Sequence, residues 1–149
     1  TMDRNDPSYA NAYVNSLVKE IIPFVEKNFR AIPNRASRAI AGLSMGGGHT
    51  TSATILYPGT FDYICPMSSG IRESEQLDAN LQGIKKAGYK LYWIGCGSGD
   101  TLAYQNSQVL DKALTRNGME HTLFISDGGH EWKNWRLYLN TFARLLFRK

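Results

Sequence analysis

Four short apolar runs alternate with stretches of helical periodicity along this chain of 149 residues, and this alternation limits its fold more than any other feature. Each run has the length of a β-strand, whereas apolar residues recur at spacings of three and four between the runs. Such alternation favours a parallel sheet joined by right-handed crossovers. The expected strands are residues 38–43, 61–67, 90–96 and 122–126, and the expected helices are residues 8–30, 46–57, 104–116 and 135–147, with a loop and a helix within residues 72–86.

The first expected helix, residues 8–30, carries apolar side chains on one face, and we expect that face to pack against other elements of the fold. Its members are Tyr13, Leu17, Ile21, Phe24 and Val25. Pro23 lies inside this pattern. Because its ring removes a backbone donor and crowds the preceding turn, it should kink or interrupt the helix.

Composition and charge exclude several classes of protein. The chain is 42% hydrophobic and 20% charged, as in ordinary globular proteins, and its length suits one domain. The net charge of +4 is spread along the chain, so no basic stripe indicates a nucleic-acid partner. No run approaches the roughly 18 apolar residues of a membrane span. Residues 1–7 lack the apolar core of a signal peptide, although a removed signal would leave no trace.

The two cysteines, Cys65 and Cys96, fall inside or at the end of expected strands. They are too few for a disulfide framework. No Cys-x-x-Cys or closely spaced histidine accompanies them, so they do not indicate a metal site. We therefore expect both to be buried, unpaired thiols.

The sequence Gly42-Leu43-Ser44-Met45-Gly46 directly follows the first expected strand and opens an expected helix. Gly-x-Ser-x-Gly at such a junction is typical of a strained turn that holds a serine hydroxyl clear of the sheet. Small residues are expected two positions before and after the serine, because strand and helix backbones nearly touch there. The backbone N–H of Met45 would face a developing oxyanion, together with the positive end of the helix. The pattern predicts Ser44 as a nucleophile.

Two further polar side chains follow later strands. A serine nucleophile needs a base to take its proton and an acidic group to orient that base. Asp100 follows strand 90–96, and His130 follows strand 122–126 in a Gly-rich loop. Because the carboxyl ends of parallel strands meet at one edge of the sheet, we expect Ser44, Asp100 and His130 to gather there. Their order along the chain is that of α/β-hydrolases.

Other residues offer alternatives for these roles. Asp127 is close to His130 in sequence and is expected only to shape its loop, so Asp100 is the preferred acid. His49 lies within the helix after Ser44 and should project from another face, and His121 opens a strand at the opposite end of the sheet.

Two tryptophans, Trp132 and Trp135, closely follow the base. An aromatic wall that binds substrate and a place in the core would each explain them. We expect Trp132 to face substrate and Trp135 to belong to the core.

Taken together, the motifs resemble those of the putative esterase (esterase D-like) family of α/β-hydrolases, and within it the feruloyl and acetyl-xylan esterases of carbohydrate esterase family one. The resemblance covers nearly all of the chain. It rests on residues 42–47, on Phe61-Asp62 leading to Ser68-Ser69-Gly70, on residues 97–100, and on Gly128-Gly129-His130 followed by Trp135.

The resemblance implies a three-layer α/β-hydrolase sandwich with a mostly parallel sheet. It implies Ser44 as nucleophile, Asp100 as acid and His130 as base in ester hydrolysis through an acyl-enzyme, with no metal or organic cofactor. The implied substrates are feruloylated or acetylated esters of xylan and its oligosaccharides, which would place the protein outside the cell or in the periplasm. An S-formylglutathione-type thioester hydrolase and a non-catalytic hydrolase-like module are the alternatives.

The chain departs from the family before the serine turn. The family places several strands there, with a loop among them that donates a second oxyanion N–H, whereas here only one expected helix precedes the strand that leads to Ser44. We therefore expect residues 1–149 to be the C-terminal portion of a single α/β-hydrolase domain. The strand before Ser44 would then have an unpaired edge, which proteins normally cover. The missing N-terminal half or a second copy of the chain would cover it.

Overall fold

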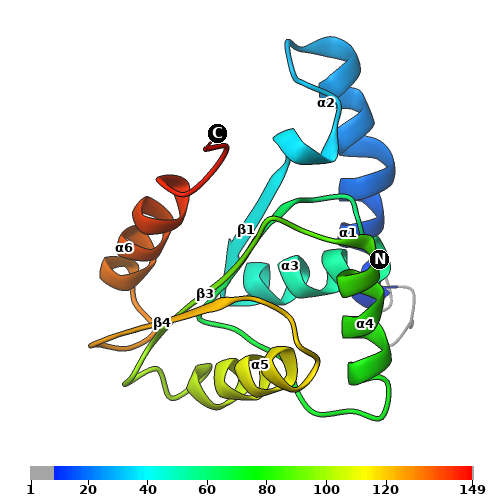
Figure 1. Ribbon diagram of the computed structural model, residues 1–149. Helices are drawn as coiled ribbons and strands as arrows, with labels where there is room; N and C mark the ends of the chain where they lie inside the picture. Colours follow the sequence, from blue (N-terminus) through cyan, green and yellow to red (C-terminus); the bar gives the residue numbers. More distant parts are fainter. Residues whose placement is uncertain (1–8, 149) are drawn as a thin grey trace.

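A computed structural model describes residues 9–148 and shows a sheet of four parallel strands with helices on both faces (Figure 1). The strands are β1 (Ala39–Leu43), β2 (Tyr63–Met67), β3 (Leu91–Gly97) and β4 (Thr122–Ser126). They lie side by side in chain order, and each pairs in parallel with the next. The predicted α/β fold and all four strands are confirmed.

Three crossover helices join successive strands: α3 (Met45–Leu56), α4 (Leu77–Ala87) and α5 (Tyr104–Arg116). Because each connection moves to the next strand in the same direction, right-handed crossovers place all three helices on one face of the sheet. The last helix, α6 (Trp132–Ala143), follows β4 and covers the opposite face (Figure 1). It begins and ends earlier than the predicted range 135–147. The result is the expected three-layer arrangement.

The core consists of two apolar clusters, one on each side of the sheet. Side chains alternate along a strand, so Ile64 points to one cluster and Cys65 to the other. The first cluster packs aliphatic residues of α4 and α5 against the sheet. The second is largely aromatic and lies beneath α6, where Trp93 contacts Tyr138 and Phe142. Every residue of β2 is buried, as expected for an interior strand.

The N-terminal segment is helical in three parts: α1 (Tyr9–Ser16), a π-helical turn η1 (Leu17–Ile21) and α2 (Ile22–Asn28). The predicted start at Ser8 lies outside the described residues. Pro23 falls in the first turn of α2, where its missing N–H donor costs little. The predicted interruption at Pro23 therefore takes the form of a change in helix type. A short 3₁₀ turn, η2 (Arg35–Ser37), then leads into β1.

The prediction that the apolar face of this helix packs against other elements is wrong for most of its members. Tyr13, Ile21, Phe24 and Val25 are between 38% and 60% exposed, and Leu17 is only partly buried. Val14, on a neighbouring face, is fully buried in the core, and Leu17, Val18 and Ile22 pack against the core while partly buried. Helical periodicity indicates which face is apolar, but it does not tell what covers that face.

An apolar groove of about 1170 Å³ runs along β1 instead. Its walls include Tyr13, Ile21 and Val25 from the helical segment, residues 39–42 of β1, and Phe147 beyond α6. Among residues 9–148, β1 pairs only with β2, so its other edge faces this groove.

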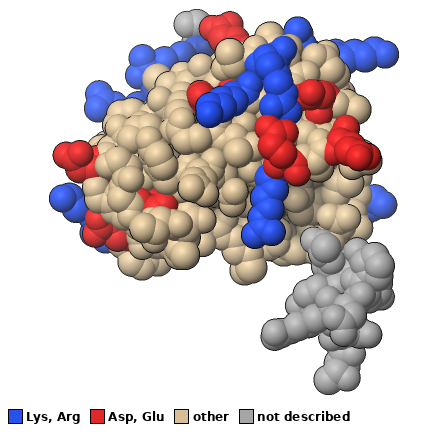
Figure 2. Space-filling view, turned by 90° about the horizontal axis from the view of Figure 1, so that it is seen from below, with Lys and Arg blue, Asp and Glu red and all other residues tan. Residues whose placement is uncertain are grey.

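Cys65 and Cys96 are both buried free thiols, as predicted. Burial raises the pKa of each, which keeps them protonated. None of the helices formed by residues 9–148 combines the length and apolar character of a membrane span. On the face in Figure 2, the described Lys and Arg side chains are interspersed with Asp and Glu, so this face offers no continuous basic stripe.

Candidate active site

Ser44 occupies a strained turn between β1 and α3. Its φ of 53° and ψ of −118° lie where residues other than glycine are rarely found. The Ser44 N–H donates to the carbonyl of Met67 at the end of β2 (2.9 Å), which fixes the turn to the sheet. Met45 is the first residue of α3, so its backbone N–H belongs to the first turn, where helical donors lack intrahelical partners.

The glycines around Ser44 have unequal roles. A Cβ at Gly42 would lie 2.2 Å from the backbone oxygen of Gly46, so strand and helix approach closely here, as predicted. A Cβ at Gly46 would meet nothing within 4 Å, because this position faces the groove along β1. The expectation that Gly46 must also be small is therefore wrong. Gly47 has little room, since its Cβ would lie 2.5 Å from that of Ser69.

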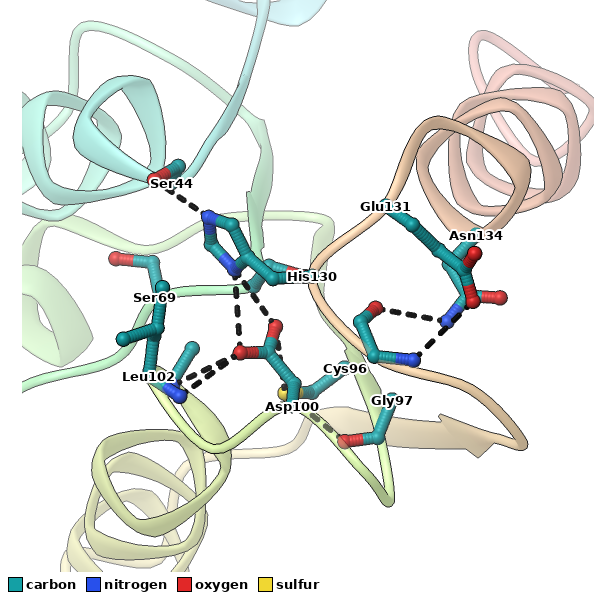
Figure 3. A network of polar contacts seen from close by, with 12 residues as sticks. Ser44, Ser69, Cys96, Gly97, Asp100, Leu102, His130, Glu131 and Asn134 are labelled. Atoms are coloured by element: carbon teal, nitrogen blue, oxygen red, sulfur yellow. Dashed lines mark hydrogen bonds and ion pairs between the residues drawn. The ribbon is translucent and has the colours of Figure 1, made fainter.

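Ser44, His130 and Asp100 form one line of polar contacts (Figure 3). The Nε2 of His130 lies 2.8 Å from Ser44 Oγ. Its Nδ1 lies 2.9 Å and 3.1 Å from the two carboxylate oxygens of Asp100. A carboxylate only accepts hydrogen bonds when ionised, so it favours the tautomer with the proton on Nδ1. Nε2 is then free to accept the proton of the Ser44 hydroxyl.

The carboxylate of Asp100 is fully buried and is oriented by backbone donors. Its Oδ1 accepts hydrogen bonds from the N–H groups of Leu102 (3.2 Å) and Ala103 (3.1 Å). These bonds and the histidine offset the cost of burying a charge. The nearby Cys96 remains a neutral thiol, because burial raises its pKa and the charge of Asp100 raises it further.

The loops that carry Asp100 and His130 are hydrogen-bonded directly to each other. The N–H of Gly99 donates to the carbonyl of Gly128 at 2.9 Å. A Cβ at Gly97 would lie 2.3 Å from that same carbonyl, so the close approach requires glycine. This contact sets the separation between the Asp100 and His130 loops.

Two side chains at the start of α6 hold the histidine loop from the other side (Figure 3). Asn134 Nδ2 donates to the carbonyl of Gly129 (3.0 Å), and Glu131 Oε1 accepts from the N–H of Gly129 (3.2 Å). The sequence analysis did not identify Glu131 or Asn134. The signal in the sequence was an acidic residue directly after Gly-Gly-His and an amide residue three positions later, at the start of a helix.

The residues weighed as alternatives to His130 and Asp100 do not take part in the contacts with Ser44. His49 stacks on Tyr13 beside the groove, with 4.7 Å between ring centroids. His121 bonds to Asp111 (3.0 Å), away from Ser44. Asp127 is exposed, and Asp100 is the carboxylate that contacts His130.

The two tryptophans differ in burial as predicted. Trp132 is 64% exposed, whereas Trp135 is 9% exposed and packs in the aromatic cluster. Met45 (76%) and Leu102 (73%) are also exposed, each close in sequence to a residue of the polar line. Sequence analysis did not single out Leu102. It could have been noticed as a large apolar residue in a polar loop after Asp100.

A serine on a strained strand-to-helix turn, aligned with a histidine and a buried aspartate at the carboxyl ends of parallel strands, defines the class of α/β-hydrolases. Comparison with known proteins then identifies the family. The Putative esterase family matches residues 2–146, and the chain belongs to this family.

The chain is similar to proteins named as esterases and as a hydrolase. The chain is 31% identical over 140 residues to an endo-1,4-beta-xylanase/feruloyl esterase of Xylanibacter ruminicola. Its fold is similar to that of a CE1 ferulic acid esterase from the anaerobic fungus Anaeromyces mucronatus (TM-score 0.78, 22% identity, 99% of this chain). It is also similar to the fold of an S-formylglutathione hydrolase from Staphylococcus aureus (TM-score 0.70, 22% identity, 92% of this chain).

These relatives are longer than the present chain. The matched part makes up 18% of the Xylanibacter protein. It makes up 59% of the fungal esterase chain and 64% of the Staphylococcus hydrolase chain.

Proposed function

We propose that this chain carries the nucleophile, base and acid of a serine carboxylic-ester hydrolase. The observation that supports this best is the line from Ser44 Oγ through His130 to Asp100, with contacts of 2.8 Å and 2.9 Å. Ser44 Oγ attacks the ester carbonyl carbon while His130 Nε2 takes its proton. His130 then gives that proton to the departing alcohol, which leaves an acyl group on Ser44. Water attacks this acyl-enzyme by the same route and regenerates the serine.

Asp100 and Met45 assist this reaction in different ways. Asp100 keeps the histidine proton on Nδ1 and stabilises the imidazolium that forms during proton transfer. The backbone N–H of Met45, at the start of α3, donates to the oxyanion of the tetrahedral intermediate. No metal or organic cofactor takes part in this scheme.

The proposed substrates are feruloyl or acetyl esters of plant cell-wall xylan and its oligosaccharides. The names of the Xylanibacter relative and the fungal structure support the feruloyl ester. The exposed ring of Trp132, two residues after His130, offers a stacking surface for an aromatic acyl group or a sugar. A polymeric substrate of this kind also requires an extracellular or periplasmic protein.

Replacement of Ser44 by alanine tests the proposal. Ser44→Ala should abolish release of ferulate from methyl ferulate and labelling by a fluorophosphonate probe. Ser52→Ala is the matched control, because Ser52 lies on the same helix α3 outside the polar line. Labelling or turnover that survives in Ser44→Ala would contradict the assignment. If Ser44 also fails to react with the probe in a longer protein that contains this chain and the proposed further strands, the chain is a non-catalytic module.

A second candidate function is hydrolysis of S-formylglutathione. It is favoured by the similar fold of the Staphylococcus hydrolase. The ratio of kcat/KM for methyl ferulate to that for S-formylglutathione decides between the two. A ratio well below one identifies the thioester hydrolase.

We further propose that residues 1–149 form the C-terminal portion of one esterase domain, and that further strands pair with the free edge of β1. The groove along β1 and the greater length of the matched structures support this. The added strands would also bring a second oxyanion N–H, whose loss costs on the order of 10²-fold to 10³-fold in kcat. The chain alone should therefore turn over esters that much more slowly than a longer protein that contains it. Equal kcat values would contradict the proposal, and light scattering would show whether a second copy covers the edge instead.

A further inference from the structure

The imidazole of His130 has a third contact besides Ser44 and Asp100. The ring of Trp135 stands at 89° to it, with 5.0 Å between the ring centroids. The partners of Nε2 and Nδ1 are Ser44 and Asp100. Hydrogen bonds at ring nitrogens are directed in the plane of the imidazole, so they restrain a tilt of that plane less than they restrain the positions of the two nitrogens. A large ring packed at a right angle to the imidazole opposes such a tilt.

Trp135 is itself anchored by a polar contact. Its indole Nε1–H donates to Ser68 Oγ at 2.9 Å, and the two residues are 9% and 1% exposed. Ser68 follows β2 and has a φ of 45°, a left-handed value that is unfavourable for a residue other than glycine. Glycine would adopt this conformation without strain but would leave the indole without its acceptor. The hydroxyl at this position therefore serves the contact with Trp135.

The same short segment also holds the nucleophile. The carbonyl of Met67, one residue before Ser68, accepts the N–H of Ser44 (2.9 Å). The N–H of Ser68 donates to the carbonyl of Gly95 in β3 (2.7 Å). Met67 and Ser68 are consecutive residues, and they fix Ser44 and the ring of Trp135 respectively. Trp135 packs on His130, which in turn contacts Ser44.

We propose that Trp135 and Ser68 act as a pair of positioning residues that hold the imidazole of His130 in line with Ser44. This role rests on the proposed hydrolase function. A purely structural Trp135 would need its apolar ring alone, and Phe would then serve as well. A positioning role needs the ring and the indole N–H together, because the hydrogen bond to Ser68 fixes where the ring stands.

The test uses two single variants and their combination. Trp135→Phe keeps a ring but removes the donor, and Ser68→Gly removes the acceptor while it relieves the positive φ, so the second variant retains a stable backbone. The first readout is the NMR resonance of the His130 Nδ1 proton, assigned by its loss in His130→Gln. We expect it to shift and to exchange faster with water in both single variants. The second readout is ester hydrolysis, where kcat should fall about 10-fold with KM nearly unchanged.

The double variant separates a shared contact from two independent ones. Because both substitutions break the same hydrogen bond, Trp135→Phe with Ser68→Gly should lower kcat by about as much as either change alone. Trp93→Phe is the matched control, since Trp93 is buried in the same aromatic cluster but contacts Phe124 and Tyr138. It should lower the melting temperature and leave the His130 resonance in place.

Two results would overturn the proposal. One is an unchanged His130 resonance in both single variants, and the other is a double variant whose loss of kcat equals the product of the single losses. The resonance does not depend on turnover. It therefore still decides the positioning role if Ser44→Ala shows that the proposed hydrolase function is wrong.

Discussion

Replacement of Gly42 by alanine should destabilise the protein through the turn that carries Ser44. The added Cβ would lie 2.2 Å from the backbone oxygen of Gly46, 2.4 Å from its carbonyl carbon and 3.0 Å from its Cα. All three atoms are backbone, so no change of side-chain rotamer can relieve the contact. To reach the 3.4 Å at which ordinary van der Waals contact begins, β1 and the start of α3 must separate by about 1 Å.

The size of the effect follows from the rigidity of these two elements. Overpacking in a well-packed interior costs typically 1–3 kcal/mol, and we expect the upper end because backbone lies on both sides. At roughly 2–4 °C per kcal/mol for a domain of this length, the melting temperature should fall by about 6–12 °C. The same displacement moves Ser44 Oγ away from His130 Nε2. The kcat for ester hydrolysis should therefore fall even at temperatures where the Gly42→Ala protein is fully folded.

Gly48→Ala is the matched control within α3. A Cβ at Gly48 would meet nothing within 4 Å, and alanine is favoured over glycine in a helix by about 0.5–1 kcal/mol. The two substitutions should therefore change stability in opposite directions. Thermal and urea unfolding followed by circular dichroism measure both. A Gly42→Ala protein that unfolds at or above the temperature of the unsubstituted chain would refute the close approach.

Three further predictions concern single side chains. Asp100→Asn should lower kcat by about 10⁴-fold with little change in KM, because an amide does not enforce the Nδ1 proton; a loss below about 10-fold would contradict this. Cys65 and Cys96 should both resist a disulfide reagent in the folded protein and react in urea, since burial raises the pKa of each; rapid reaction of the native protein would be inconsistent with it. The hydrogen bond from Arg116 lowers the pKa of Glu73 in the folded protein. The Glu73 carboxylate therefore stabilises the fold above its unfolded pKa of about 4.3, and this stabilisation is lost as the pH falls through the lower folded pKa. The urea midpoint of Arg116→Met should therefore be lower than that of the unsubstituted protein at neutral pH and converge with it in acid, and a gap that persists in acid would argue against the ion pair.

The strand positions and the gathering of Ser44, Asp100 and His130 were predictable, because both follow from local patterns and one topological rule. Apolar runs of strand length mark the sheet, and polar residues after them fall at its carboxyl edge. The contacts of 2.8 Å and 2.9 Å within this group confirm that the three meet.

Features that depend on what lies opposite a residue could not be derived in this way. The periodicity of residues 8–30 identifies an apolar face, but it does not show which element packs against that face. Tyr13 and Phe24 were therefore expected to be packed, whereas the structure leaves them exposed. Gly46 fits the serine motif as well as Gly42 does, yet only a Cβ at Gly42 would clash. The hydrogen bond between Trp135 and Ser68 joins residues far apart in the sequence, and no local sequence pattern predicts it.

The strand order β1-β2-β3-β4, identical to the order in the chain, has a consequence for synthesis on the ribosome. A growing chain folds from its N-terminal end, so each strand can join a neighbour that has already emerged. The hydrogen bond from Ser44 N–H to the carbonyl of Met67 can form once β1 and β2 pair. His130 arrives only after β4 is added, and Asn134 of α6 must follow before its loop is held. Under the proposed function, a nascent chain exposes Ser44 before His130 can take its proton, and reactivity of Ser44 would report that β4 and α6 are in place.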